Sequence, residues 1–145
     1  MTEIAETRWM GNMAFEATID GFPVRMDTTP GLGGTGFGPR PKPMILSSLA
    51  GCTGMDVVSI LSKSKVPFIG LKIEVSGDLS EQHPKYYQTI RIVYHFWGPG
   101  FSGNTDILTK ITRAVELSGE KYCGVSAMLK NSCDISYAIQ LHNSE

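Results

Sequence analysis

The segment that most constrains the fold is an apolar stretch in the middle of the chain, from Met44 to about Ser64. Its large aliphatic residues recur at spacings of three and four, which is typical of a helix; they are Leu46, Leu49, Val57, Ile60 and Leu61. Pro41 and Pro43 suit the first helical turn. The apolar residues cover much of the circumference, so we expect other elements to bury this helix on most sides.

A stripe of small residues follows one side of the predicted helix, at Ser47, Gly51 and Gly54. A glycine inside a helix costs about 1 kcal/mol relative to alanine. The stripe therefore predicts that another backbone packs closely against this side.

The rest of the chain supplies strands and shorter helices. Asp20-Gly21 lies between two alternating runs and predicts a hairpin turn. We expect short strands within 3–28, a Gly- and Pro-rich loop at 29–43, an antiparallel pair at 70–79 and 86–97, a helix from Asn104 or Thr105, a short helix at 123–130, and a last strand at 135–141. Grouped helices and strands indicate an α+β fold, and 145 residues suit a single domain over 1–145.

Charge and hydropathy limit the partners and the compartment. Thirteen Lys and Arg against fourteen Asp and Glu give a formal net charge of -1, which argues against a nucleic-acid binder. The N-terminus has no apolar run suited to a signal peptide, and polar residues and glycines interrupt the longest candidate membrane span, 44–61. We expect a soluble cytoplasmic protein that binds neither nucleic acid nor membranes.

Three cysteines are the candidates for chemistry. Cys52 lies mid-helix and is either a small core residue or a reactive thiolate, which would need a nearby cation because the helix dipole acts mainly at the first turn. Cys123 lies at the start of a short helix, a position that lowers a thiol pKa. Cys133 enters the last strand, and we expect a structural role for it.

A metal site is not expected, because the three histidines fall in separate elements and no cysteine pair has C-x-x-C spacing. Asp56 lies four residues after Cys52, on the same helical face. A carboxylate in a buried helix needs a partner. Asp56 either orients an arginine near Cys52 or caps another backbone segment without a chemical role, and we favour the second.

Two segments together resemble the OsmC / organic hydroperoxide resistance family. They are PKPMILSSLAGCTGMDVVSIL in the central helix and AVELSGEKYCGVSAML near the C-terminus. The similarity is greatest to the small OsmC-like branch of that family. It implies an OsmC-like fold, with antiparallel sheets around a long buried central helix, in an intertwined homodimer with sites at the subunit interface.

The resemblance also implies a thiol peroxidase for oxidative stress defence, with no cofactor. In that reaction Cys52 attacks the O–O bond of an organic hydroperoxide and becomes a sulfenic acid, and Cys123 condenses with it to a disulfide. A dithiol reductant of the lipoyl or thioredoxin type then regenerates both thiols. The apolar residues expected to bind the alkyl part of the substrate are Leu49, Met55, Tyr122 and Met128.

The chain departs from the hydroperoxide-reducing enzymes at the position of the activating cation. Those enzymes take an arginine from the first strands and a glutamate from the start of the central helix. Here the early turn at 9–13 has no arginine and the helix start at 40–44 has no glutamate. Arg40, Lys42 or Arg25 are the candidate substitutes, and Asp56 is a candidate supporting residue.

This departure leaves a second hypothesis open. The chain would then be a non-catalytic protein with the same fold, binding a small apolar ligand at the dimer interface. A redox sensor ranks last, because the sequence shows no element that would bind DNA.

Overall fold

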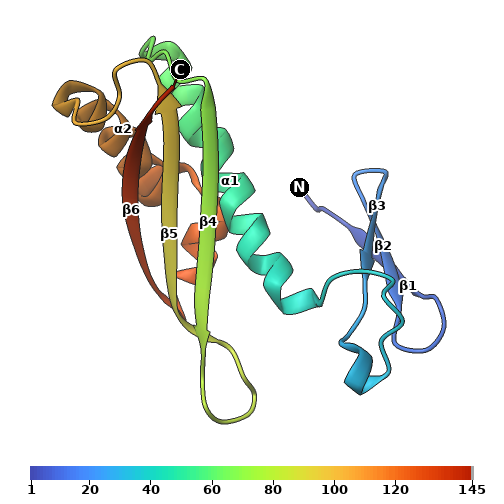
Figure 1. Cartoon of the computed structure of the whole chain (residues 1–145). Coiled ribbons are helices and arrows are strands. Elements are labelled where there is room, and N and C mark those ends of the chain that lie inside the picture. Colours follow the sequence, from blue (N-terminus) through green and yellow to red (C-terminus); the bar gives the residue numbers. More distant parts are fainter. Residues whose placement is uncertain (145) are drawn as a thin grey trace. The chain divides into compact units, whose positions relative to one another are not determined.

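The computed structural model describes residues 1–144, and the chain divides into two compact units, Met1–Ile45 and Leu46–Glu145. The elements follow one another in the predicted order, with strands first, then the long helix, two strands, a helical region and a last strand (Figure 1). The expected α+β class is confirmed. The single domain over 1–145 stays a prediction.

The first unit contains a three-stranded antiparallel sheet. Its strands are β1 (Ala5–Trp9), β2 (Phe15–Ile19) and β3 (Phe22–Met26). Asp20 and Gly21 join β2 to β3 with positive φ angles of 52° and 81°. Positive φ at both central residues defines the type I′ turn that the Asp-Gly pair predicts.

The Gly- and Pro-rich loop after β3 is organised around one buried carboxylate, that of Asp27. Asp27 accepts backbone N–H groups from Thr28 at 2.8 Å, Thr35 at 3.0 Å and Phe37 at 3.1 Å. These hydrogen bonds favour the ionised form and lower the pKa of Asp27. A short 3₁₀ turn, Pro30–Leu32, lies within this loop.

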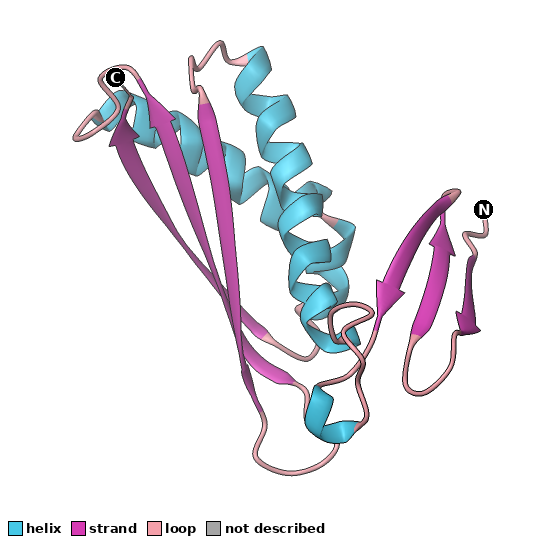
Figure 2. Cartoon of the chain, turned by 45° about the vertical axis from the view of Figure 1, so that its right-hand side comes forward, coloured by secondary structure: helices cyan, strands magenta, loops and turns pink. Residues whose placement is uncertain are grey.

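The second unit contains the other sheet and nearly all of the helical structure. Its elements are α1 (Pro41–Lys63, which begins in the first unit), β4 (Gly70–Leu79), β5 (Tyr87–Gly98), α2 (Thr105–Leu117), a π-helical turn (Ser118–Tyr122), α3 (Gly124–Leu129) and β6 (Asp134–Asn143). The helices lie on one face of the sheet (Figure 2). The Asn104 side chain caps α2, as predicted, by accepting the N–H of Ile107 at 3.1 Å.

The expectation of purely antiparallel sheets is wrong for this second sheet. β4 and β5 are antiparallel, but β5 and β6 are parallel, in the order β4-β5-β6. The reason is the connection: α2, the π-helical turn and α3 carry the chain from the end of β5 back to the start of β6. Parallel neighbours require a long crossover of this kind.

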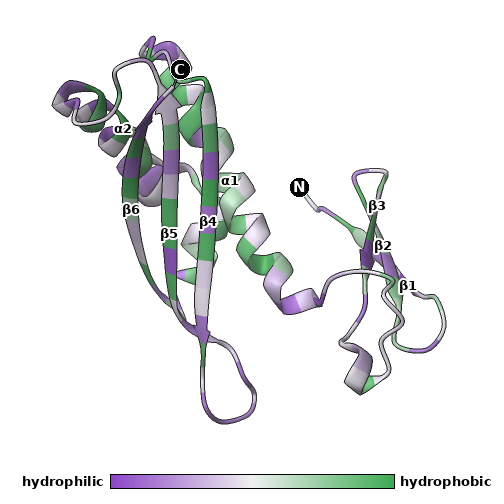
Figure 3. Cartoon of the chain, in the orientation of Figure 1, coloured by the Kyte–Doolittle hydropathy of each residue, from purple (hydrophilic) through white to green (hydrophobic). Residues whose placement is uncertain are grey.

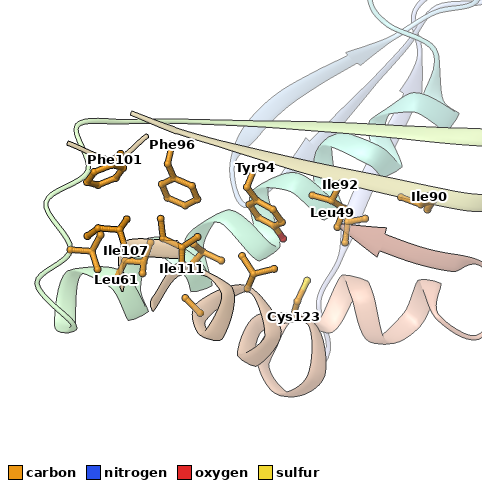
Figure 4. Close-up of a cluster of buried hydrophobic side chains, with 14 of the residues drawn as sticks. Leu49, Leu61, Ile90, Ile92, Tyr94, Phe96, Phe101, Ile107, Ile111 and Cys123 are labelled. Atoms are coloured by element: carbon orange, nitrogen blue, oxygen red, sulfur yellow. The ribbon is translucent and has the colours of Figure 1, made fainter. Parts of the chain in front are cut away.

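The core lies between this sheet and the helices and contains Tyr94, Phe96 and Phe101 (Figure 4). α1 contributes one buried stripe to the core, made of Leu49, Thr53, Gly54, Val57 and Leu61. Apolar residues occur all along the helix (Figure 3), yet Met55 is 76% exposed. Within one chain, therefore, the expectation that other elements bury α1 on most sides is wrong.

The small-residue stripe contacts a side chain, and the prediction of a second backbone there is wrong for the single chain. A Cβ at Gly54 would come within 2.9 Å of Ile73 Cδ1, on β4. A Cβ at Gly51 would have no neighbour within 4 Å. One end of the stripe thus permits close packing of β4 and the other end is open.

α1 is also long and apolar enough to cross a membrane, contrary to the expectation from the sequence. By itself this is weak evidence, because core helices of soluble proteins pass the same test. The helix carries Thr53 and Asp56, which both make polar contacts inside the second unit. The absence of membrane binding stays a prediction.

Candidate active site

The structure brings together two thiols that are far apart in the sequence. Cys52 lies half-buried on α1, and Cys123 lies between the π-helical turn and α3 with 3% of its surface exposed. The Cys52 side chain lies close enough to the Cys123 thiol to interact with it and to raise its pKa. Both cysteines are free thiols.

Cys133 makes a separate contact with the backbone. Its buried thiol donates a hydrogen bond to the carbonyl oxygen of Tyr87 at 2.9 Å. This contact ties the start of β6 to the start of β5. It is the geometry of a structural cysteine.

Burial controls the acidity of Cys123. Its sulfur caps α3 by accepting the N–H of Ser126 at 3.3 Å, and this bond lowers the pKa as the helix start predicts. Burial and the contact with Cys52 act in the opposite direction and outweigh it, raising the pKa to about 11. The predicted lowering is therefore wrong in its net sign, and Cys123 is a protonated thiol at neutral pH.

A chain of buried hydroxyl groups runs beside the thiols. The Tyr94 hydroxyl on β5 lies 2.7 Å from Thr53 Oγ1, which lies 2.9 Å from Ser118 Oγ. Ser118 Oγ in turn lies 2.9 Å from the Asp56 carboxylate. A carboxylate only accepts hydrogen bonds, so the Ser118 hydroxyl is the donor to Asp56, and it also donates toward Thr53 Oγ1. Either hydroxyl can be the donor in the hydrogen bond between Tyr94 and Thr53.

Asp56 has a partner that neither sequence hypothesis anticipated. The partner is the hydroxyl of Ser118, and not an arginine or a backbone group. The negative charge of Asp56 also contributes to the raised pKa of both Cys123 and Tyr94. Asp56 thus places a negative charge near the Cys123 thiol.

A cavity of about 210 Å³ lies next to this network. Thr53 and Tyr94 line it, as does Ser126, whose N–H bonds to Cys123. Its wall is mostly apolar and comes from α1, β5, α2, the π-helical turn, α3 and β6, together with Lys130 after α3. The remaining lining residues are Leu49, Ile92, Val115, Glu116, Gly119, Glu120, Lys130, Ile135 and Tyr137.

The four predicted substrate-binding residues do not form one pocket within the chain. Leu49 lines the cavity, whereas Met55 lines a separate groove of about 600 Å³ along α1 and β4, together with Gly51 and Gly54. Tyr122 and Met128 are exposed and line neither space.

The candidate cations Arg25, Arg40 and Lys42 belong to the first unit. There Arg25 forms an ion pair with Glu16 at 3.2 Å and lies over the Phe37 ring. Activation of Cys52 by Arg40 or Lys42 stays a prediction. Within residues 1–144, His, Cys, Asp and Glu form no group of three that could hold a metal ion.

Sequence reasoning missed Thr53, Tyr94 and Ser118. Thr53 and Ser118 are polar residues at buried positions of the helical segments, and such positions need a hydrogen-bond partner. The polar residues themselves are visible in the sequence, but the contacts of α1 with β5 and with the π-helical turn are not.

Comparisons with known proteins agree with the fold. The model of the OsmC-like protein family matches residues 33–138. Protein YhfA of Escherichia coli K12 is 27% identical over 94% of this chain and 96% of its own.

Among solved structures, a hypothetical protein from Aquifex aeolicus VF5 superposes with a TM-score of 0.79, at 28% identity over 98% of each chain. The organic hydroperoxide resistance protein OhrB of Bacillus subtilis superposes with a TM-score of 0.65, at 18% identity over 97% of this chain and 98% of its own. The second likeness concerns the fold alone. The two sheets, the central helix and the family match together show that this chain belongs to the OsmC-like protein family.

Proposed function

We propose that the protein is a thiol-dependent peroxidase that reduces organic hydroperoxides through Cys52 and Cys123. The observation that carries the proposal is the contact between these two side chains, which come from distant parts of the sequence. A pair of adjacent free thiols is the arrangement needed to pass from a sulfenic acid to a disulfide.

The chemistry divides between the two cysteines. The Cys52 thiolate attacks the terminal peroxide oxygen, the O–O bond breaks, and the departing alkoxide takes a proton to leave as an alcohol. Cys52 is then a sulfenic acid. The Cys123 sulfur attacks the Cys52 sulfur, the S–O bond breaks, and the thiol proton leaves with the hydroxide as water. A dithiol of the lipoyl or thioredoxin class then reduces the disulfide by exchange.

The cavity next to the hydroxyl network suits the alkyl part of such a substrate. Its lining includes Leu49, Ile92, Val115 and Ile135, while Thr53 and Tyr94 supply hydroxyl groups. Ligand sites are commonly apolar with a few placed polar groups. This arrangement supports an alkyl or aryl hydroperoxide over hydrogen peroxide as the substrate.

A homodimer is part of the proposal. The groove along α1 and β4 is open and apolar, and Met55 and Val58 are exposed in it. The first unit buries only two apolar side chains, Ala14 and Ala17, among its described residues. A second, intertwined copy would cover such surfaces. It would also bring a second set of the candidate cations Arg40 and Lys42 to the assembly.

A second function is favoured by a specific observation. The charge near the thiol pair is the carboxylate of Asp56, and an anion disfavours the thiolate. A non-catalytic protein that binds a small apolar ligand at the dimer interface would need no activating cation. Its thiols would react slowly with peroxide at neutral pH.

Cumene hydroperoxide consumption, with dihydrolipoamide as the reductant, separates the two functions. Cys52→Ser should abolish consumption, and Cys123→Ser should stop turnover after one equivalent. Cys133→Ser is the matched control and should retain turnover. Equal rates for wild type and Cys52→Ser would exclude the peroxidase and favour the binding protein, as would thermal stabilisation by cumyl alcohol without thiol loss. Cytoplasmic location and a role in oxidative stress defence belong to the same proposal.

A further inference from the structure

Ser118 contacts both of the segments that carry the reactive thiols. Its hydroxyl lies 2.9 Å from Thr53 and 2.9 Å from Asp56, both on α1 next to Cys52 or one turn after it. Its carbonyl oxygen accepts the backbone N–H of Cys123 at 2.8 Å. Ser118 is itself fully buried. One residue thus joins the Cys52 helix to the backbone of Cys123.

The π-helical turn makes this double contact possible. The bond from the Cys123 N–H to the Ser118 carbonyl spans five residues, as in a π-helix. A regular α-helix would direct this carbonyl to the N–H four residues on, which belongs to Tyr122. Single π turns are rare and frequently lie at functional sites. Here the wider turn ends at Cys123 and places its N–H on Ser118.

We propose that Ser118 is a positioning residue that holds Cys123 against Cys52 for disulfide formation. A disulfide requires Cα atoms about 4.4 to 6.8 Å apart and a defined torsion about the S–S bond. Two anchors to α1 and one to the Cys123 backbone restrict the relative movement of the segments that must meet this geometry. The inference rests on the use of this pair in the proposed function, but it concerns how the pair is held.

The redox equilibrium distinguishes positioning from a merely structural role. Loss of a buried hydroxyl that only supports the fold destabilises the dithiol and disulfide forms alike, so their ratio does not change. Loss of a group that holds the two thiols together lowers the effective concentration of one thiol at the other. The equilibrium constant for forming the disulfide then falls.

The test is the Cys52–Cys123 dithiol–disulfide equilibrium of the full chain in dithiothreitol redox buffers. Peptide mass spectrometry identifies the bridge, and thermal unfolding of the reduced protein reports stability. Ser118→Ala should lower the equilibrium constant about tenfold, equivalent to about 30 mV. The matched control is Ser80→Ala. Ser80 is also buried, and its hydroxyl accepts the N–H of Tyr86 at 3.1 Å, so its loss should lower stability and leave the constant unchanged.

An unchanged constant in a folded Ser118→Ala variant would overturn the inference, as would a wild type that forms no bridge between these two cysteines. If Ser118→Ala does not fold, Asp56→Ala removes the other end of the contact at a half-buried position, and the same fall in the constant is expected. No hydroperoxide is present in this assay. A wild type that forms the bridge but does not consume hydroperoxide would contradict the proposed function while leaving the role of Ser118 intact.

Discussion

The Asp56 carboxylate lies 2.9 Å from the Ser118 hydroxyl and faces the buried thiol of Cys123 with a negative charge. The contact stabilises the packing of α1 against the π-helical turn. The charge opposes the ionisation of Cys123. One side chain therefore contacts the residue that holds the Cys123 backbone and disfavours ionisation of the Cys123 thiol, which suits the resolving role proposed for Cys123.

Replacing Asp56 by asparagine separates these two effects. Asparagine still offers an oxygen to the Ser118 hydroxyl but carries no charge, so the pKa of Cys123 should fall below about 11. Site-resolved iodoacetamide alkylation against pH measures this change. Asp106→Asn, at an exposed position paired with Lys110, should leave the profile of Cys123 unchanged. A Cys123 profile unaltered by Asp56→Asn would contradict the proximity of this charge.

Stability should fall at alkaline pH because of Cys123. Its pKa rises from 9.0 to about 11 on folding, so its contribution is fully present below pH 9 and is lost as the pH rises through 11. This rise in the pKa corresponds to about 3 kcal/mol of stability. Urea unfolding of the reduced protein at pH 8 and pH 11 measures the loss. Cys123→Ala should show a smaller loss over this interval, although it starts from a lower stability. Equal losses in both proteins would contradict the raised pKa.

The fold was largely predictable because its signals are local. The Asp20-Gly21 turn, the alternation in β4 and β5 and the cap at Asn104 depend on neighbouring residues, and the structure confirms each. The parallel pairing of β6 was not predictable in this way. It depends on which edge of β5 remains free after β4 has paired, and no residue in β6 encodes that choice.

In the candidate site, too, features that depend on neighbouring residues could be predicted and features that depend on distant elements could not. Cys52 and Cys123 are conspicuous in the sequence through their family-like segments, but the net acidity of Cys123 depends on burial by distant elements. The partner of Asp56 depends on the π-helical turn, which the sequence pattern does not predict. Gly54 does permit close packing, but against the Ile73 side chain and not against a second backbone, and Gly51 lies in an open groove.

Thr53 connects two parts of the buried hydroxyl chain. Its loss should therefore lower the free energy of unfolding, and this effect should depend on whether the Tyr94 hydroxyl is present. Thr53→Val leaves the Tyr94 hydroxyl without the partner it has at 2.7 Å, and an unsatisfied buried polar group costs about 1 to 3 kcal/mol. Tyr94→Phe removes that group. The double variant should therefore be more stable than the sum of the two single effects predicts. Urea unfolding of the four proteins measures the coupling, and strict additivity would show that this hydrogen bond contributes nothing.

The groove along α1 and β4 should control self-association. Met55 is 76% exposed there and lies beside Gly51 and Gly54, so a charge at Met55 would remain in water in the monomer but would be buried under a second copy. Met55→Lys should convert the proposed dimer to monomer with little change in the unfolding of the single chain. Leu108→Lys, at an exposed position on α2, is the control and should remain dimeric. Sedimentation velocity measures both variants. A Met55→Lys protein that stays dimeric at micromolar concentration would show that the second copy binds a different surface.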